Sequence, residues 1–344
     1  MENLLIDLRS DTVTRPTPGM LEAMFNARVG DDVFDEDPTV KKLEQKAADI
    51  FGKEAGLFCP SGTMTNQIGI RLQTQPQQEI LCDKLSHIYY YEGGGIASNS
   101  GLSMRLLDGV RGKITPEQVE DNINPPDNIH QPFTSLVSLE NTSNKGGGSY
   151  YHYAEMKSIC DVARKHHLNT HLDGARIFNA FIETGDSPME TGKLFDTISV
   201  CLSKGLGAPV GSVLLSTKDN IQKAKRIRKA FGGGMRQSGY LAAAGLYALD
   251  HHITRLKEDH IRAKNIESTL KSQSYVKEIL PVDTNIIVFR IDDNLPVTSF
   301  LRQLNDKNIK AVQFGKQTVR FVTHLDFTDD MLQILTNELN KIRV

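Results

Sequence analysis

Short apolar runs alternate with amphipathic helical segments along much of this chain, and that alternation constrains the fold more than any other feature. The runs of strand character are Glu79–Cys82, Ser103–Leu107, Ser135–Leu139, Thr170–Asp173, Thr197–Leu202 and Ser212–Leu215. Helical spacing of apolar residues precedes or separates them, as in the segment that opens at Asp37-Pro38 and stops at Gly52. Successive strand–helix units are typical of a parallel sheet covered by helices on both faces. The sequence therefore predicts an α/β fold with a mostly parallel sheet flanked by helices.

The pattern changes near residue 238, which indicates a second structural unit. A long helical stretch runs from there to Leu270, and strands follow at Asn285–Ile291 and Thr318–Thr323. Helices are expected around Ser299–Leu304 and after Thr328. We therefore expect a large domain over residues 1–245, in which residues 1–25 form an arm that reaches the functional site. Residues 246–344 form a smaller α+β domain.

Composition excludes several classes of protein. A formal net charge of −2 over 344 residues provides no electrostatic attraction to nucleic acid or to an acidic membrane surface. No apolar run approaches the ~20 residues that a membrane span needs. The cysteines Cys59, Cys82, Cys160 and Cys201 stand far apart in apolar contexts, as reduced core thiols do. We expect a cytoplasmic protein with neither nucleic-acid nor membrane partners.

Lys204 ends the apolar run Thr197–Leu202 and leads directly into Gly205 and Gly207. A lysine at the end of a buried strand is unfavourable unless its charge is neutralised or used. Its neutral amine is the nucleophile that forms a Schiff base with an aldehyde. Asp173 ends another predicted strand, and ligands on such sheets gather where the parallel strands end. A lysine for the aldehyde and an aspartate for a pyridine nitrogen are the pair that pyridoxal phosphate requires.

Two further segments fit such a cofactor, although each also has an ordinary structural explanation. Gly62 and Thr63 open a helix whose free N–H groups favour a phosphate, but a Ser-Gly-Thr stretch is often a plain N-cap. His87 follows a strand and a short loop. It could stack on a flat cofactor ring or belong to an aromatic patch on the surface.

Arginines and histidines elsewhere leave alternatives open. Arg320 lies in the middle of a strand, where either a ligand carboxylate or an internal salt bridge is needed to compensate its charge. Arg236 follows a glycine triplet and could reach a phosphate or a neighbouring subunit. His171 and Asp173 share one face of a strand, but no ligand set at metal-binding spacing accompanies them or His167. No metal site is expected.

Short motifs spread over the whole chain belong together. They occupy residues 7–16, 29–33, 37–40, 60–63, 138–142, 173–180, 201–207, 232–239 and 320–326. In composition and order they resemble the low-specificity L-threonine aldolase family, within the aspartate-aminotransferase-like (fold type I) pyridoxal phosphate enzymes. Residues 143–148, Ser-Asn-Lys-Gly-Gly-Gly, depart from the family pattern as a longer and more glycine-rich loop.

The resemblance implies a set of cofactor contacts. Lys204 would carry pyridoxal 5'-phosphate as an internal aldimine, and Asp173 would pair with the pyridinium nitrogen. The remaining contacts would come from Gly62 and Thr63 at the phosphate, His87 on the ring, Arg176 near the ring hydroxyl, and Arg236.

The resemblance also implies a substrate site shared between subunits. This site would comprise Ser10 and Arg320 at the substrate carboxylate, His130 near the substrate hydroxyl, Arg176, and Tyr91. Tyr91 and Arg236 would be lent across an interface. That arrangement implies a homodimer with shared active sites, usually paired into a tetramer.

The implied activity is cleavage of L-threonine, L-allo-threonine and related β-hydroxy-α-amino acids to glycine and an aldehyde. Besides Lys204, the catalytic groups would include a base, for which His87, His130 and an ordered water are the candidates. The alternatives are a β-eliminating lyase on the same scaffold, a cofactor-binding regulator without turnover, and an α/β protein without a cofactor.

Overall fold

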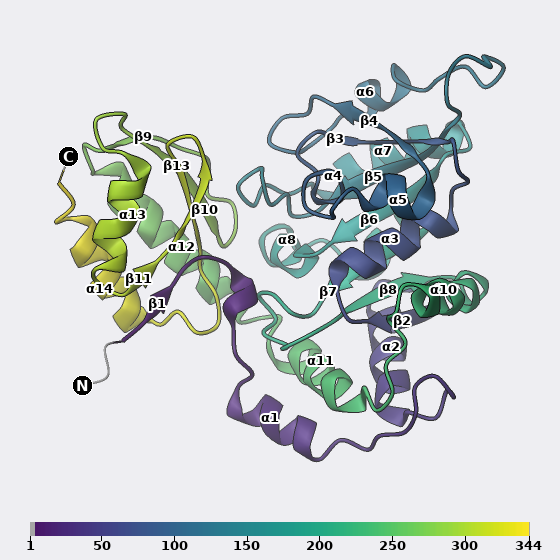
Figure 1. The fold of residues 1–344 in the computed structure, drawn as a ribbon, viewed down its shortest axis with the longest axis horizontal. Coiled ribbons are helices and arrows are strands. Elements are labelled where there is room, and N and C mark those ends of the chain that lie inside the picture. The colour runs from purple at the N-terminus through teal and green to yellow at the C-terminus, as the bar shows by residue number, and fades with distance from the viewer. Residues whose placement is uncertain (1–3, 344) are drawn as a thin grey trace.

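A seven-stranded sheet forms the centre of the larger part of the molecule (Figure 1). The computed structural model describes residues 4–343. The strands, in the spatial order β2-β8-β7-β6-β5-β3-β4, are β2 (Ala55–Cys59), β8 (Ser212–Ser216), β7 (Thr197–Cys201), β6 (Asn169–Gly174), β5 (Thr134–Glu140), β3 (Glu79–Asp83) and β4 (Ser103–Leu107). The pairs from β7 to β4 are parallel, and only β8 runs antiparallel to its two neighbours. The predicted mostly parallel α/β fold is confirmed.

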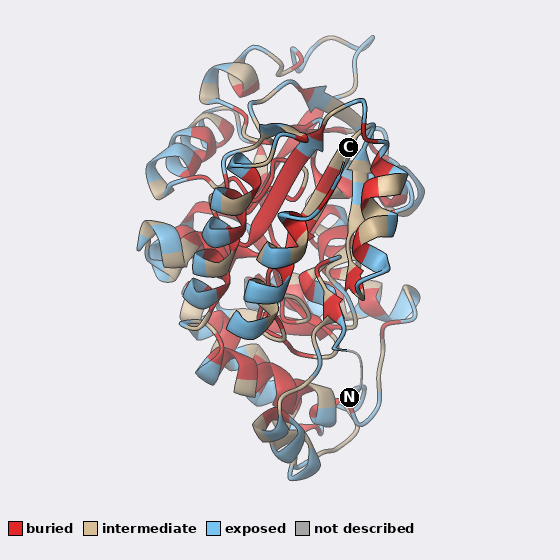
Figure 2. Cartoon of the chain, turned by 90° about the vertical axis from the view of Figure 1, so that its left-hand side faces the viewer, coloured by how far each residue is buried: buried red, intermediate tan, exposed pale blue. Residues whose placement is uncertain are grey.

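Helices cover both faces of this sheet, so the inner strands β5 to β8 are almost entirely buried, whereas the edge strand β4 is partly exposed (Figure 2). Alternate residues of a strand face opposite cores: Val213 and Leu215 pack in one cluster, whereas Leu214 packs in another. The helices of this part are α1 (Pro18–Phe25), α2 (Pro38–Phe51), α3 (Gly62–Leu72), α4 (His87–Tyr90), α5 (Gly95–Ser100), α6 (Pro116–Glu120), α7 (Tyr153–Lys165), α8 (Ile177–Thr184), α9 (Pro188–Leu194), α10 (Lys218–Ala230) and α11 (Gly239–His251). Within residues 4–343, no helix has the length and apolar character that crossing a membrane requires.

Helix α2 shows how local sequence sets its ends. The Asp37 carboxylate accepts the backbone N–H groups of Thr39 and Val40, and Pro38 occupies the first turn. The helix stops at Gly52, whose φ of 60° lies in the left-handed region. The helix predicted from Asp37-Pro38 to Gly52 is confirmed.

A smaller antiparallel sheet carries the C-terminal part of the chain. Its strands, in the order β12-β13-β10-β9, are β12 (Val312–Gly315), β13 (Thr318–Val322), β10 (Ile286–Ile291) and β9 (Val276–Ile279). Helices α12 (Leu256–Lys271), α13 (Val297–Asn305) and α14 (Asp329–Leu339) accompany it (Figure 1). Phe289, Phe300 and Phe321 lie in the core of this unit.

The N-terminal arm packs against the small unit before it reaches the large one. Strand β1 (Ile6–Asp7) pairs in parallel with β11 (Ile309–Lys310), and Ile6 and Leu8 are buried in the C-terminal core. A short 3₁₀ helix, Asp11–Val13, follows, and then α1 packs against α11 of the large unit. The arm therefore crosses from one unit to the other beside the carboxyl edge of the large sheet.

One sequence-based expectation about the helices is wrong. The stretch predicted as a single long helix through Leu270 forms two helices, α11 and α12, separated by a turn over residues 252–255. The β-branched Ile253 and Thr254 have below-average helix propensity. His252 Nδ1 also lies 2.7 Å from the Leu206 carbonyl oxygen, which fixes the turn against the large unit.

Candidate active site

A cavity of about 200 Å³ lies at the edge where the parallel strands β6 and β7 end. The lining residues are Pro60, Ser61, Gly62, Thr63, Asn66, His87, Asp173, Ala175, Cys201, Ser203 and Lys204. The fold therefore brings together five residues that the sequence indicated separately: Gly62, Thr63, His87, Asp173 and Lys204.

Lys204 has no acidic partner in the part of the chain that the structure describes. Its Nζ atom lies 3.6 Å from Cys201 Sγ, which is the hydrogen-bond contact of its side chain. The amine is half-buried and faces the cavity. Such a position suits a lysine that reacts rather than one that is locked in an ion pair.

Asp173 lies at the floor of the cavity and is 3% exposed. Its oxygens accept the Ala175 N–H at 3.1 Å and the Asn66 Nδ2–H at 2.9 Å. These are neutral donors, so the carboxylate keeps its charge available for a cationic group placed in the cavity.

His171 supports this floor rather than a metal. Nδ1 lies 2.7 Å from Thr197 Oγ1 and Nε2 lies 3.1 Å from Asn66 Oδ1, so both ring nitrogens have partners. Burial lowers the pKa of His171 to about 4, so the ring is neutral. His167 is exposed at the opposite end of β6.

The first turn of α3 provides a cradle for an anion. The Ser61 hydroxyl caps the Met64 N–H, and the N–H groups of the first turn of a helix lack intrahelical acceptors. A side chain at position 62 would place Cβ 2.5 Å from Cys201 Sγ, so the close approach of the two segments requires glycine.

His87 begins α4 and is oriented by two carboxyl groups. Its backbone N–H donates to Glu140 Oε2 at 2.8 Å, and Nδ1 lies 2.9 Å from Glu92 Oε1. Burial alone would lower the pKa of His87, but the Glu92 hydrogen bond and the nearby Asp173 charge outweigh it and raise the pKa. His87, Glu92 and Asp173 each bring a ligand atom within 4.8 Å of the others, but Glu92 already accepts from Asn66 and Gln67.

Arg320 is half-buried and has no acidic partner among residues 4–343. Nη1 donates to Asn144 Oδ1 at 2.7 Å and Nη2 to the Arg9 carbonyl at 2.8 Å, whereas the buried Nε has no acceptor. Burial lowers the pKa of Arg320 to about 10. The internal salt bridge that the sequence also allowed is not formed, and an anionic ligand would complete the site.

Arg176 is held by Asp11, a residue that sequence reasoning did not single out. Arg176 Nε and Nη2 donate to the two oxygens of Asp11 at 2.7 and 2.6 Å. Burial would raise the pKa of Asp11, but the charges of Arg176 and Lys204 lower it to about 2. Ser10, next in the chain, caps the 3₁₀ helix by accepting the Thr12 N–H at 3.2 Å.

Six predicted site residues do not line this cavity: Ser10, Tyr91, His130, Arg176, Arg236 and Arg320. Tyr91, His130 and Arg236 are exposed on the surface of their own chain. His130 is exposed on the loop before β5, where its N–H donates to Asn128 Oδ1. Arg236 is on the surface and pairs with Asp31 at 2.9 Å. Tyr91 is 45% exposed, and its ring centroid lies 5.5 Å from that of His87.

The loop that departs from the family pattern lies beside Arg320. In this loop, Asn144 Oδ1 accepts a hydrogen bond from the Arg320 guanidinium. Lys145 Nζ lies 4.2 Å from the centre of the Tyr90 ring. Lys145 Nζ also lies 5.5 Å from the Phe314 ring, which Arg320 covers at 4.7 Å. The loop of residues 143–148 therefore packs around the Arg320 side chain.

Sequence reasoning missed the residues that hold the indicated ones in place: Asp11, Asn66, Glu92, Glu140 and Asn144. Glu140 had a signal of the same kind as Asp173, because it is the last residue of an apolar strand. The others become visible only through their long-range partners.

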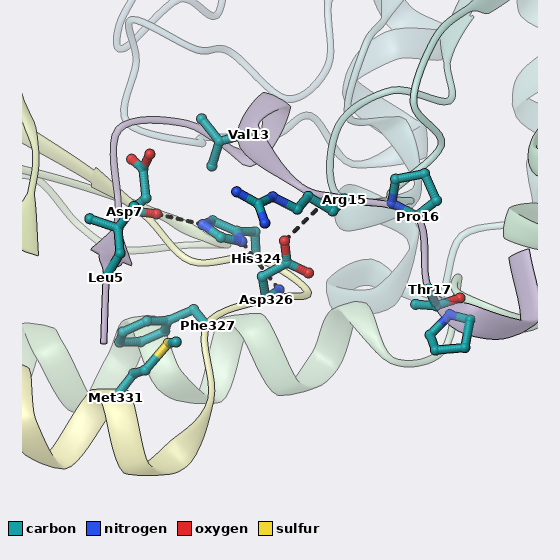
Figure 3. Close-up of a pocket in the computed structure, with 11 residues that line it drawn as sticks. Leu5, Asp7, Val13, Arg15, Pro16, Thr17, His324, Asp326, Phe327 and Met331 are labelled. Carbon is teal, nitrogen blue, oxygen red and sulfur yellow. Dashed lines mark hydrogen bonds between the residues drawn. The ribbon is translucent and has the colours of Figure 1, made fainter. Parts of the chain in front are cut away.

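A second and larger cavity, of about 440 Å³, lies between the arm and the small unit (Figure 3). In it the His324 Nε2–H donates to the Asp7 carbonyl at 2.6 Å, and the Arg15 N–H donates to Asp326 Oδ2 at 3.0 Å. Leu5, Phe327 and Met331 supply apolar walls. Lys204 and Asp173 do not line this cavity, so the reactive groups gather in the smaller one.

The smaller cavity fits pyridoxal phosphate. The Lys204 amine, which has no ion partner in the described part of the chain, matches the aldehyde of the cofactor. The buried Asp173 carboxylate matches the ring nitrogen, and the helix start at Gly62 matches the phosphate. The orphaned Nε of Arg320 provides for an additional anion nearby.

Comparisons with known proteins show the family and the fold of this chain. Residues 7–294 match the family described as beta-eliminating lyase. The chain is 40% identical to the low specificity L-threonine aldolase of Escherichia coli (strain K12) over 330 residues, which cover 95% of this chain and 96% of that protein.

Solved structures share the fold over almost the whole chain. A threonine aldolase of Leishmania major has a TM-score of 0.85 at 19% identity, covering 98% of this chain and 99% of that one. Serine palmitoyltransferase (SPT) with its PLP internal aldimine has a TM-score of 0.76 at 16% identity, covering 98% and 87%. The fold is thus that of the fold type I enzymes. By sequence, the chain belongs to the low-specificity L-threonine aldolase family.

Proposed function

We propose that this protein is a pyridoxal phosphate-dependent aldolase that cleaves L-threonine and L-allo-threonine, and related β-hydroxy-α-amino acids, to glycine and an aldehyde. The observation that carries this proposal is the grouping of a lysine amine and a buried aspartate in one cavity, together with Arg320, for which residues 4–343 offer no acidic partner. The names of the relatives support the choice of substrate.

Arg320 and Ser10 bind and orient the amino acid. A carboxylate beside Arg320 satisfies the buried Nε and neutralises a charge that no acidic group of the described residues compensates. Fixing the carboxylate sets which bond at Cα is aligned for cleavage, and so favours Cα–Cβ cleavage over other reactions. When bound through Lys204, pyridoxal phosphate supplies the electron sink for that cleavage.

Asp173 and His87 supply the charge and the proton acceptor. The Asp173 carboxylate stabilises a positive ring nitrogen, which strengthens the electron sink. Because Glu92 binds His87 at Nδ1, Nε2 is the atom that accepts the proton of the substrate β-hydroxyl as the Cα–Cβ bond breaks. His130 on its exposed loop and an ordered water are the other candidates for this base.

An assay of the purified holoenzyme with both threonine diastereomers tests the proposal. Glycine and acetaldehyde in equal amounts are expected, whereas ammonia and a keto acid would identify a β-eliminating lyase. A bound cofactor whose absorbance stays unchanged in excess threonine would identify a regulator without turnover. Lys204→Ala should remove both the bound-cofactor absorbance and the cleavage while leaving the circular dichroism spectrum unchanged; retained cleavage refutes the role of Lys204.

We further infer a homodimer with shared active sites, paired into a tetramer. Phe25, Phe34 and Ile129 are separate large apolar side chains that expose 86%, 71% and 92% of their surface, and contact with a partner subunit would bury them. Arg236 lies over the exposed Phe34 ring, and we propose that Arg236 and Tyr91 reach the partner's site.

Mixing two inactive variants tests this sharing. Lys204→Ala and Arg236→Ala subunits, dissociated and reassembled together, should regain activity, because each mixed dimer holds one site with both native residues. If mixed dimers are present by mass spectrometry but activity does not recover, the sharing of active sites is refuted.

A reducing, cytoplasmic compartment is inferred from the four buried cysteines, all of which are free.

A further inference from the structure

Glu140 is a buried carboxyl group that the proposed chemistry does not use. It is the last residue of β5 and pairs in register with Asp173 of β6, so the two carboxyl groups stand side by side at the edge of the sheet. Glu140 is 5% exposed and does not line the cavity of Lys204. Its position calls for another explanation.

Both oxygens of Glu140 accept backbone N–H groups from separate parts of the site. Oε2 accepts the N–H of His87 at 2.8 Å, and Oε1 accepts the N–H of Asn144 at 2.9 Å. Asn144 Oδ1 in turn accepts Arg320 Nη1 at 2.7 Å. A continuous chain of hydrogen bonds therefore runs from the histidine at the ring to the arginine at the substrate carboxylate.

We propose that Glu140 is a positioning residue that holds His87 and, through Asn144, Arg320 in one fixed relation. The proposal rests on the function proposed above. A carboxylate offers an acceptor on each oxygen, so it can hold two N–H groups at once. An amide offers one such oxygen, and an aspartate is shorter by one methylene.

The electrostatic environment of Glu140 opposes its ionisation. Burial and the neighbouring Asp173 raise the pKa of Glu140 to about 7. The two N–H groups stabilise the ionised form. A substitution at Glu140 should therefore alter the positions of both His87 and Arg320.

Binding measurements on three variants test the proposal. Glu140→Gln should weaken the affinity of the holoenzyme for glycine about tenfold, by isothermal titration calorimetry, and should also weaken the affinity of the apoenzyme for pyridoxal phosphate. Asn144→Ala should weaken glycine binding alone, because it breaks only the link to Arg320.

Glu79→Gln is the matched control. Glu79 is also 5% exposed and accepts hydrogen bonds from Arg105 and Asn124, but it begins β3 at the other end of the sheet. This variant should lower the melting temperature and leave both affinities unchanged.

Two results would overturn the proposal. The first is wild-type affinity of Glu140→Gln for both glycine and cofactor. The second is wild-type affinity of Asn144→Ala for glycine. This second result refutes the proposal even if Glu140→Gln does not fold. The double variant should bind glycine no more weakly than Glu140→Gln, and additive losses contradict the chain. Because glycine binding needs no cleavage, absence of threonine cleavage in the wild type refutes the proposed function alone.

Discussion

The buried ion pair of Asp11 and Arg176 makes a quantitative prediction for the Asp11→Asn variant. Asp11 is fully buried, and the Arg176 side chain is 5% exposed. Asparagine keeps the shape but turns an N–H donor toward the guanidinium in place of an acceptor. Removing one partner of a buried pair costs about 3–5 kcal/mol, because the other charge is left uncompensated.

The lowered pKa of Asp11 gives a second and smaller value for the contribution of the ion pair to the free energy of unfolding. Its decrease from 3.8 to about 2 corresponds to about 2 kcal/mol in favour of the ionised form, after the burial that opposes ionisation. That stability is complete above pH 3.8 and is lost as the pH falls toward 2. The substitution should cost more, since it also leaves Arg176 buried without a counter-charge.

Urea unfolding at pH 7, followed by circular dichroism, measures this loss. The matched control is Asp161→Asn, because Asp161 is 48% exposed and pairs with Lys157 on the surface of α7. The Asp161→Asn variant should lose less than about 1 kcal/mol of its free energy of unfolding. If Asp11→Asn loses no more than this control, the reasoning from burial is refuted.

Three further changes should give distinct results. Gly62→Ala should weaken binding of pyridoxal phosphate in an absorbance titration, because the new Cβ would lie 2.5 Å from Cys201 Sγ; adding Cys201→Ala should restore part of it, and no recovery contradicts the explanation. Arg320→Gln should raise the KM for threonine at least tenfold with unchanged cofactor absorbance, and a wild-type KM contradicts the carboxylate role. His171 has its pKa lowered from 6.5 to about 4, so its stabilising contribution is present above pH 6.5 and lost as the pH falls toward 4. The stability advantage of wild type over His171→Gln should therefore shrink by about 3 kcal/mol across that range in urea unfolding, and a constant difference contradicts this.

The position of Lys204, Asp173 and Gly62 in one cavity could be predicted because their signals are local. Asp173 lies at the carboxyl end of β6 and Lys204 follows the carboxyl end of β7, and these parallel strands end at the same edge of the sheet. Gly62 likewise follows a strand and opens a helix. A single run of sequence thus contains the information that places each of them.

The residues that hold these groups depend on contacts that no local pattern contains. Asp11 binds Arg176 from 165 positions away, and Asn144 binds Arg320 from 176 positions away. The turn between α11 and α12 also depends on a long-range contact, because His252 contacts the carbonyl of Leu206 in another part of the chain. Tertiary contacts of this kind override helix propensity.

The pairing of β1 with β11 also has a consequence for how the protein is made. Ile6 cannot find its partner Ile309 until about 300 further residues have left the ribosome. At roughly 5–20 residues per second, the arm waits about 15–60 s during synthesis. Over that interval the apolar Ile6 and Leu8 are without the core that buries them, and Asp11 reaches Arg176 from an untethered arm. The large sheet can form early, but the complete site is among the last parts of the molecule to assemble.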